Sequence, residues 1–208
     1  MKEREPMIFI VDDDDGVRAS LRVLLKSVGI AATPLASAQE FLASYQPSQP
    51  GCLLLDIRMP GMSGLELQAE LNVRGVIIPV IFITGHGDVP MAVEAMQHGA
   101  FDFLQKPFRD QDVIDRVQKA LARDRENRDA LQSHERIRAL LKSLTPRERE
   151  VLDLMASGKA NKVMATELGL SPRTVEIHRA HVMEKMAAHS VAQLVRMMME
   201  VEPQSFAH

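Results

Sequence analysis

The chain has 208 residues, 46% of them hydrophobic, and a formal net charge of −3 at pH 7. This length fits one large domain or two ordinary ones, and the hydrophobic content excludes a chain that is disordered throughout. The sequence has no apolar run of about 20 residues, the length that spans a bilayer. The apolar stretch 7–11 is too short for a secretory signal, and the single cysteine, Cys52, cannot form an intramolecular disulfide. We therefore expect a cytoplasmic protein with no membrane partner.

The charge is distributed unevenly along the chain. Residues 1–122 carry 11 Lys and Arg and 16 Asp and Glu, whereas the remaining residues carry 14 and 12. This asymmetry suggests two domains with different partners. It does not by itself indicate nucleic-acid binding, because residues 145–208 contain eight basic and eight acidic side chains.

Short apolar runs alternate with amphipathic stretches through the first half of the chain. In chain order, the pattern predicts a strand at 7–11, a helix at 17–28, a strand at 31–34, a helix at 38–45, a strand at 52–55, a helix at 65–71, a strand at 80–83, a helix at 91–97, a strand at 101–104 and a helix at 112–121. Five such units indicate an α/β fold with a five-stranded parallel sheet, doubly wound by helices on both faces. The ligand site of such a sheet lies at the carboxyl ends of its strands.

Residues 120–142 are rich in charge and contain neither glycine nor proline. We interpret them as the end of the preceding helix running into a helical linker, with a solvated, disordered linker as the alternative. The expected organisation is therefore a first domain at 1–122, a helical linker at 123–142 and a second domain at 143–208.

The second domain shows no strand pattern. Thr145, Pro146 and Glu148 begin a helix as its N-cap, first residue and capping-box partner. A helix at 161–168, expected to bury Val163, is followed by a tight turn at 169–171 and a helix at 173–186. Two helices joined in this way form a helix-turn-helix, whose second helix enters the major groove of DNA. A small helical bundle that binds no DNA has the same pattern, so this alternative stays open.

Polar side chains end four of the strands expected in the first domain. They are Asp12 with Asp13, Asp56, Thr84 and Lys106. Three carboxylates at one edge repel each other unless a cation lies among them, and hard oxygen ligands suit Mg²⁺. With Lys106 and the Thr84 hydroxyl, the edge can receive a phosphoryl group, and Asp56 is the natural nucleophile because aspartate forms an acyl phosphate. Taken singly, the acidic residues could be helix caps and the Lys106-Pro107 pair a simple turn.

The order of these motifs resembles that of response-regulator receiver domains. The matching stretches are Val11-Asp12-Asp13-Asp14, the run from Leu55 to Gly64, Ile83-Thr84-Gly85-His86-Gly87 and Lys106-Pro107-Phe108. The resemblance covers about the first 120 residues and implies a flavodoxin-like receiver. The stretch from Thr84 to Met96 resembles the FixJ branch particularly closely. Its phosphate-sensing hydroxyl and lysine are then Thr84 and Lys106. Phe103 stands at the switch position, where a phenylalanine cannot make a phenolic hydrogen bond.

The same resemblance implies a magnesium site and a dimer. Asp13, Asp56 and the backbone carbonyl of Arg58 are the expected direct ligands, and Asp12 would hold metal-bound water. The Lys106–Pro107 peptide bond is expected to be cis, as it often is in the family. On phosphorylation, two receivers are expected to pair through the helix at 89–98 and the strand at 101–104.

The second domain resembles the LuxR/FixJ-type DNA-binding domain. The match runs through Thr145-x-Arg147-Glu148-x-Glu150-Val151-Leu152, Gly158, Asn161-Lys162, Ala165, Leu168, Ser171-x-Arg173-Thr174-Val175, His178 and Lys185. It implies that base edges are read by Thr174, Glu176, Ile177 and Ala180. The implied phosphate contacts are Lys162, Arg173, Arg179 and Lys185, with His178 as a further contact or a partly buried helix histidine.

Three functions are compatible with these patterns. The first, which we favour, is a two-component response regulator whose partners are a sensor histidine kinase, promoter DNA and RNA polymerase. The second is a phosphatase that forms its own aspartyl phosphate, but such enzymes usually carry the nucleophile on the first strand and add a cap that this chain lacks. The third is a helix-turn-helix regulator with a vestigial receiver, which the intact set of Asp13, Asp56, Thr84 and Lys106 argues against.

Overall fold

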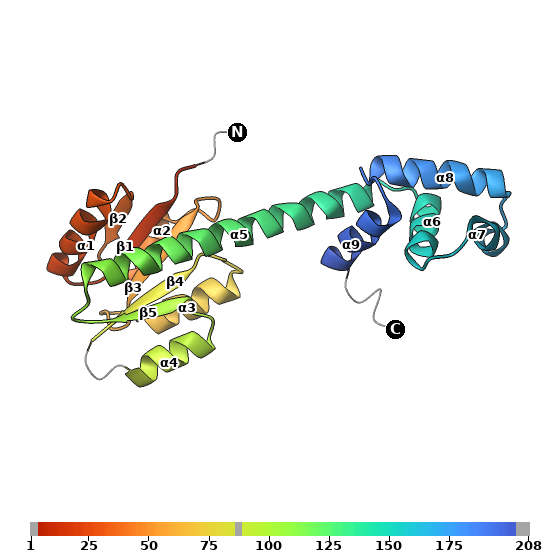
Figure 1. Cartoon of the computed structure of the whole chain (residues 1–208). Coiled ribbons are helices and arrows are strands. Elements are labelled where there is room, and N and C mark those ends of the chain that lie inside the picture. Colours follow the sequence, from red (N-terminus) through yellow and green to blue (C-terminus); the bar gives the residue numbers. More distant parts are fainter. Residues whose placement is uncertain (1–3, 86–88, 203–208) are drawn as a thin grey trace. The chain divides into compact units, whose positions relative to one another are not determined.

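The computed structural model describes residues 4–85 and 89–202 (Figure 1). His86 and Gly87, which belong to the motif that follows Thr84, lie outside the described residues. The chain divides into two compact units, Met1–Arg128 and Asp129–His208. None of the helices described here is long and apolar enough to cross a membrane.

The N-terminal unit contains a parallel sheet in the order β2-β1-β3-β4-β5. Its strands are β1 (Met7–Val11), β2 (Ala32–Leu35), β3 (Gly51–Asp56), β4 (Val80–Thr84) and β5 (Asp102–Gln105). This confirms the predicted five-stranded α/β fold. The register pairs Val11 with Leu55, Asp56 with Ile83, and Thr84 with Gln105. The carboxyl ends of four strands therefore meet at one edge of the sheet.

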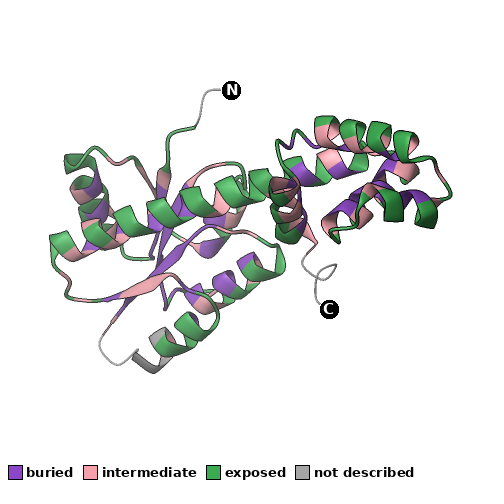
Figure 2. Cartoon of the chain, turned by 45° about the vertical axis from the view of Figure 1, so that its right-hand side comes forward, coloured by how far each residue is buried: buried purple, intermediate pink, exposed green. Residues whose placement is uncertain are grey.

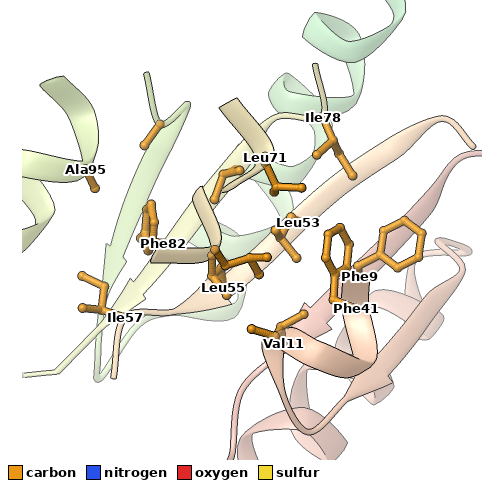
Figure 3. Close-up of a cluster of buried hydrophobic side chains, with 14 of the residues drawn as sticks. Phe9, Val11, Phe41, Leu53, Leu55, Ile57, Leu71, Ile78, Phe82 and Ala95 are labelled. Atoms are coloured by element: carbon orange, nitrogen blue, oxygen red, sulfur yellow. The ribbon is translucent and has the colours of Figure 1, made fainter. Parts of the chain in front are cut away.

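Helices cover both faces of this sheet, as its continuous apolar strands predict. They are α1 (Asp15–Ser27), α2 (Ala38–Ser44), α3 (Gly64–Val73), α4 (Val89–Gln97) and α5 (Asp110–Lys142). One core packs the sheet against α2, α3 and α4 through Phe41, Leu67, Leu71 and Ala95. Figure 3 shows Phe41, Leu71 and Ala95 in this core. The other packs it against α1 and α5 through Leu21, Leu25, Val113 and Val117. The outward faces of the helices are exposed (Figure 2).

Capping side chains set the starts of two helices beside the strand ends. The carboxylate of Asp14 accepts hydrogen bonds from the N–H groups of Gly16 and Val17, so α1 begins at Asp15, two residues earlier than predicted. Ser63 and Glu66 form a reciprocal capping box at the start of α3. The first turns of α1 and α3 are thus fixed next to Asp12 and Asp56.

Helix α5 is a single helix over Asp110–Lys142. The helical interpretation of residues 120–142 is therefore correct, and the disordered alternative is not. Its first part contributes Val113, Val117 and Ala120 to the core of the N-terminal unit. Near its other end, Ile137 and Leu141 belong to the core of the C-terminal unit.

The C-terminal unit continues with α6 (Pro146–Ala156), α7 (Asn161–Leu168), α8 (Pro172–Lys185) and α9 (Val191–Val201). Thr145 and Glu148 form the predicted capping box, and Gly169 ends α7 in the left-handed conformation. The prediction that Val163 is buried was wrong, because its side chain is 42% exposed and its neighbours Met164 and Ala165 fill the core instead.

Candidate functional site

The ammonium group of Lys106 joins the ends of β1 and β3. It donates hydrogen bonds to Asp12 Oδ2 at 2.9 Å and to Asp56 Oδ1 at 3.0 Å. The other oxygens are held by backbone: Asp12 Oδ1 accepts from the N–H of Asp14, and Asp56 Oδ2 from the N–H of Arg58 at 2.7 Å. Both carboxylates are buried. The predicted meeting of strand ends therefore places an aspartate and a lysine in direct contact across 50 residues of sequence.

Burial and neighbouring charges shift the pKa values of Asp56 and Lys106 in opposite directions. Burial raises the pKa of Asp56 above its ordinary value, and Lys106 offsets only part of this effect. Burial alone would lower the pKa of Lys106, but its hydrogen bonds to both carboxylates outweigh burial and raise it. Lys106 is therefore an ammonium at neutral pH, and two acidic side chains share it.

The predicted convergence of three carboxylates is only partly formed. Asp13 is exposed, and the described residues contain no group of three or more His, Cys, Asp or Glu side chains arranged to hold a metal ion. The donor chemistry nevertheless fits a hard cation, because the oxygen atoms of two buried acidic side chains already meet at the edge of the sheet. Asp13 follows directly on Asp12, within reach of the same edge.

Thr84 ends the neighbouring strand and is buried. Its hydroxyl donates a hydrogen bond to the carbonyl oxygen of Leu104 at 3.3 Å, and its own carbonyl accepts from the N–H of Lys106 at 2.7 Å. Phe103, one residue before Leu104, is half-buried against the core that includes α4. The predicted switch residues are thus connected to Lys106 through β5. The Lys106–Pro107 bond is cis, as expected.

Two features of this site were not predicted. The guanidinium of Arg18, on α1, donates to the backbone carbonyl of Asp12 and pairs with Asp15. Gly64 lies so close to β3 that a Cβ atom there would be 2.2 Å from the carbonyl oxygen of Asp56. Each feature has a signal in the sequence. Arg18 follows an acidic run by one helical turn, and Gly64 stands at the first position of a helix.

The outer face of α8 carries most of the side chains proposed to read bases. Glu176, Ile177 and Ala180 are exposed, whereas Thr174 is half-buried and bonded through its hydroxyl to Ser171. Among the predicted phosphate contacts, Lys162 and Arg173 are exposed and Arg179 is half-buried. Arg173 pairs with Glu176 at 3.1 Å.

Two other predicted DNA contacts are partly turned inward. His178 is half-buried, and its Nδ1 is buried without a hydrogen-bond partner among the described residues. Lys185 donates a hydrogen bond to the buried carboxylate of Glu148 at 2.6 Å. The sequence pattern assigned Glu148 to the capping box with Thr145, and so did not predict that it also binds Lys185.

Comparison with known families matches both units. Residues 8–118 match the response regulator receiver domain, and residues 142–198 match the luxR family of bacterial regulatory proteins. The chain belongs to the response regulators. It combines a receiver with a LuxR-type DNA-binding domain, as predicted from its motifs.

Full-length relatives share this organisation. The regulator is 50% identical to nodulation protein W of Bradyrhizobium diazoefficiens over 92% of this chain and 84% of that protein. It is 50% identical to the transcriptional regulatory protein FixJ of Azorhizobium caulinodans over 91% and 90% of the two chains. FixJ is named a transcriptional regulatory protein, and this chain shares its DNA-binding family, so this response regulator is a transcription regulator rather than an enzyme.

Solved structures agree with this assignment. The response regulator StyR is similar with a TM-score of 0.85 at 45% identity, over 93% of this chain and 98% of that one. Full-length FixJ from B. japonicum is similar with a TM-score of 0.58 at 40% identity, over 95% and 97%. The receiver family covers Asp12, Asp56, Thr84 and Lys106, and the luxR family covers α8 in full.

Proposed function

We propose that phosphorylation of Asp56 by a sensor histidine kinase switches this response regulator and promotes its binding to promoter DNA. The observation that carries the proposal is the contact of Lys106 with Asp12 and Asp56 in a chain that also has a LuxR-type domain. The two halves of the proposal are a phosphoacceptor site in the receiver and a DNA-reading helix in the C-terminal unit.

In the proposed transfer, a carboxylate oxygen of Asp56 attacks the phosphorus of a phosphohistidine. An O–P bond forms, the N–P bond breaks, and the imidazole leaves with its electron pair. Lys106 is placed to balance the charge of the phosphoryl oxygens, and the N–H of Arg58 holds the second carboxylate oxygen of Asp56. Burial keeps bulk water from screening these contacts.

We propose that Mg²⁺ supports this transfer by neutralising phosphoryl oxygens when bound. Asp13, Asp56 and the backbone carbonyl of Arg58 would hold it directly, and Asp12 through water. The meeting of Asp12 and Asp56 at Lys106 supports this assignment, because it gathers hard oxygen ligands at the edge of the sheet. Asp13 is exposed, so its carboxylate is accessible to a cation from solvent.

The switch that we propose begins at Thr84. A phosphoryl group on Asp56 offers the Thr84 hydroxyl a charged acceptor, which is stronger than the carbonyl of Leu104 that it now contacts. Moving that hydroxyl frees space at β5, which Phe103 fills, and this change is passed on to α4. Through α4 and β5, two phosphorylated receivers would form a homodimer.

In the C-terminal unit, α8 is the proposed recognition helix. Glu176 can accept a hydrogen bond from a cytosine amino group and Ile177 can contact a thymine methyl, with Thr174 and Ala180 beside them. Lys162, Arg173, Arg179 and His178 are the proposed phosphate contacts. DNA-bound dimers would then act on RNA polymerase in the cytoplasm.

The direct test is labelling by acetyl phosphate with Mg²⁺, followed by DNA binding of the labelled protein. Wild type should become acid-labile phosphoprotein and bind DNA more tightly. Asp56→Asn should not label, whereas the exposed Asp115→Asn control should label like wild type. If wild type binds DNA equally well without ever labelling, the receiver is vestigial and the proposal fails.

A further inference from the structure

An ion pair connects the beginning of α6 to the end of the recognition helix α8. Glu148, in the first turn of α6, is 4% exposed. Its Oε2 accepts a hydrogen bond from the ammonium of Lys185, in the last turn of α8, at 2.6 Å. The same oxygen accepts from the backbone N–H of Thr145 at 2.8 Å. The two side chains thus join helices 37 residues apart in sequence.

The carboxylate of Glu148 is held in place from two sides. The capping box fixes it to the backbone at Thr145, so it cannot follow Lys185 if that side chain moves outward. His181 Nδ1 lies 3.8 Å from the other oxygen, Oε1. Lys185 and the Thr145 N–H lower the pKa of Glu148 to about 2, so the group is ionised at neutral pH.

Moving Lys185 onto a DNA phosphate would therefore be unfavourable. It would leave the ionised carboxylate of Glu148, whose side chain is 5% exposed, without its cation, and an uncompensated buried charge is destabilising. It would also do so next to the negative charge of the DNA backbone. Lys162, on α7, is exposed and faces no such cost.

We propose that Lys185 is a positioning residue, which holds the last turn of α8 on Glu148 and is not a phosphate contact. This inference rests on the proposed DNA binding by α8 and changes the role that the sequence suggested for Lys185. Glu148 is also a positioning residue, because it is the buried partner that holds Lys185. Because α8 must present Glu176 and Ile177 to base edges together, fixing its far end sets the angle at which these side chains enter the groove.

Salt dependence separates positioning from phosphate contact. Each neutralised phosphate contributes about 0.9 to the slope of log affinity against log salt concentration. The experiment uses full-length phosphorylated protein and duplexes that wild type selects from a randomised pool. The variants are Lys185→Met, which removes the charge, Lys185→Arg, which keeps it, and Glu148→Gln, which keeps the capping box but removes the ion pair. Lys162→Met is the matched control.

Lys185→Met and Glu148→Gln should each weaken specific binding on the order of three- to tenfold, and the double variant should be no worse than either alone. Their salt slopes should equal that of wild type, and Lys185→Arg should restore most of the affinity. Lys162→Met should lose about 0.9 of slope. Circular dichroism at the binding temperature confirms that each variant is folded.

A phosphate contact gives the opposite pattern. Lys185→Met would then reduce the salt slope of binding, as Lys162→Met does. Glu148→Gln would tighten binding, because it releases the lysine. Either result overturns the inference. If wild type selects no duplex at all, the proposed function fails, and the inference fails with it. If wild type selects duplexes and only the slopes disagree, the proposed function stands and Lys185 is a phosphate contact.

Discussion

The carboxylate of Asp124 accepts a hydrogen bond from the backbone N–H of Gly51 at 2.8 Å, across 73 residues of sequence. Asp124 is buried in α5 and pairs with Arg128, one turn later, at 2.8 Å. Arg128 also donates to the carbonyls of Pro47 and Gln49. Gly51 can lie here because it has no Cβ, which would meet the carbonyl oxygen of Met7 at 1.8 Å. Asp124 and Arg128 therefore anchor this part of α5 to the start of β3 and the loop before it.

Replacing Asp124 should loosen this anchor. Asp124→Ala leaves the Gly51 N–H without its acceptor and the Arg128 guanidinium without its carboxylate, which should lower the free energy of receiver unfolding by about 3 kcal/mol. The chain has one tyrosine and no tryptophan, so tyrosine fluorescence in urea reports on Tyr45, which packs against Phe9 and Phe41 in the receiver. The exposed Arg125→Ala control should change stability by less than about 0.5 kcal/mol. If the two variants changed the stability equally, Asp124 would not be the residue that anchors α5.

The fold of the receiver could be predicted because its strands are buried on both sides. All six residues of β3 are buried, and such strands appear in a sequence as continuous apolar runs. The meeting of Asp56 with Lys106 followed from the same pattern, since parallel strands end at one edge of a sheet. The capping box at Thr145 was predictable because it is local, involving residues only three positions apart.

Features that depend on side-chain direction could not be predicted. Three consecutive apolar residues, Val163, Met164 and Ala165, do not define the phase of a short helix, so Val163 was placed inside although it is exposed. Lys185 was assigned by its position in a motif, and the motif gave no sign of its hydrogen bond to Glu148. Long-range partners such as Asp124 and Gly51 leave no periodic signal.

Arg18 should support the acidic edge without binding phosphate itself. Its side chain is only 12% exposed, and it holds the backbone carbonyl of Asp12. Arg18→Gln should free the segment that carries Asp12 and Asp13 and raise the Mg²⁺ concentration for half-saturation on the order of tenfold. Amide NMR shifts of residues 12–14 during a Mg²⁺ titration measure this without phosphorylation.

Arg22, one turn further along α1, provides the matched control. It is exposed, so Arg22→Gln should leave the Mg²⁺ titration unchanged. The role assigned to Arg18 would be disproved if both variants bound Mg²⁺ as wild type does, or if both lost affinity equally.

Acid should destabilise the DNA-binding domain through Glu148. The folded-state pKa of about 2 lies below the ordinary value of 4.5, so this carboxylate contributes stability above pH 4.5 and loses it as pH falls toward 2. Urea unfolding of the full chain, followed through NMR signals of Val175 and Val182, should show stability falling across this window. Glu148→Gln should flatten the dependence between pH 4.5 and 2, whereas Glu150→Gln, at an exposed pair with Arg147, should preserve it. A wild-type profile that stays flat across the window would exclude this contribution.

Dimerisation of the phosphorylated receiver should depend on the exposed apolar side chains of α4. Val93 is 50% exposed and Met96 is 40% exposed, and their spacing of three residues places them on one side of the helix. Val93→Glu or Met96→Glu should place a charge in the interface, so the protein should label with acetyl phosphate but remain monomeric. Sedimentation velocity with and without beryllofluoride, at micromolar concentration, measures the change.

Val73 offers a control of the same chemistry on another helix. It lies at the end of α3 and is 84% exposed, so Val73→Glu should dimerise like wild type when activated. The competing mechanism is release of an intramolecular block, in which the activated protein stays monomeric and still gains full DNA affinity. In that case Val93→Glu should leave activation unchanged. Under the dimer mechanism the same variant is still phosphorylated but loses the gain in DNA affinity. A monomer binds a single half-site, whereas a dimer binds two half-sites at once.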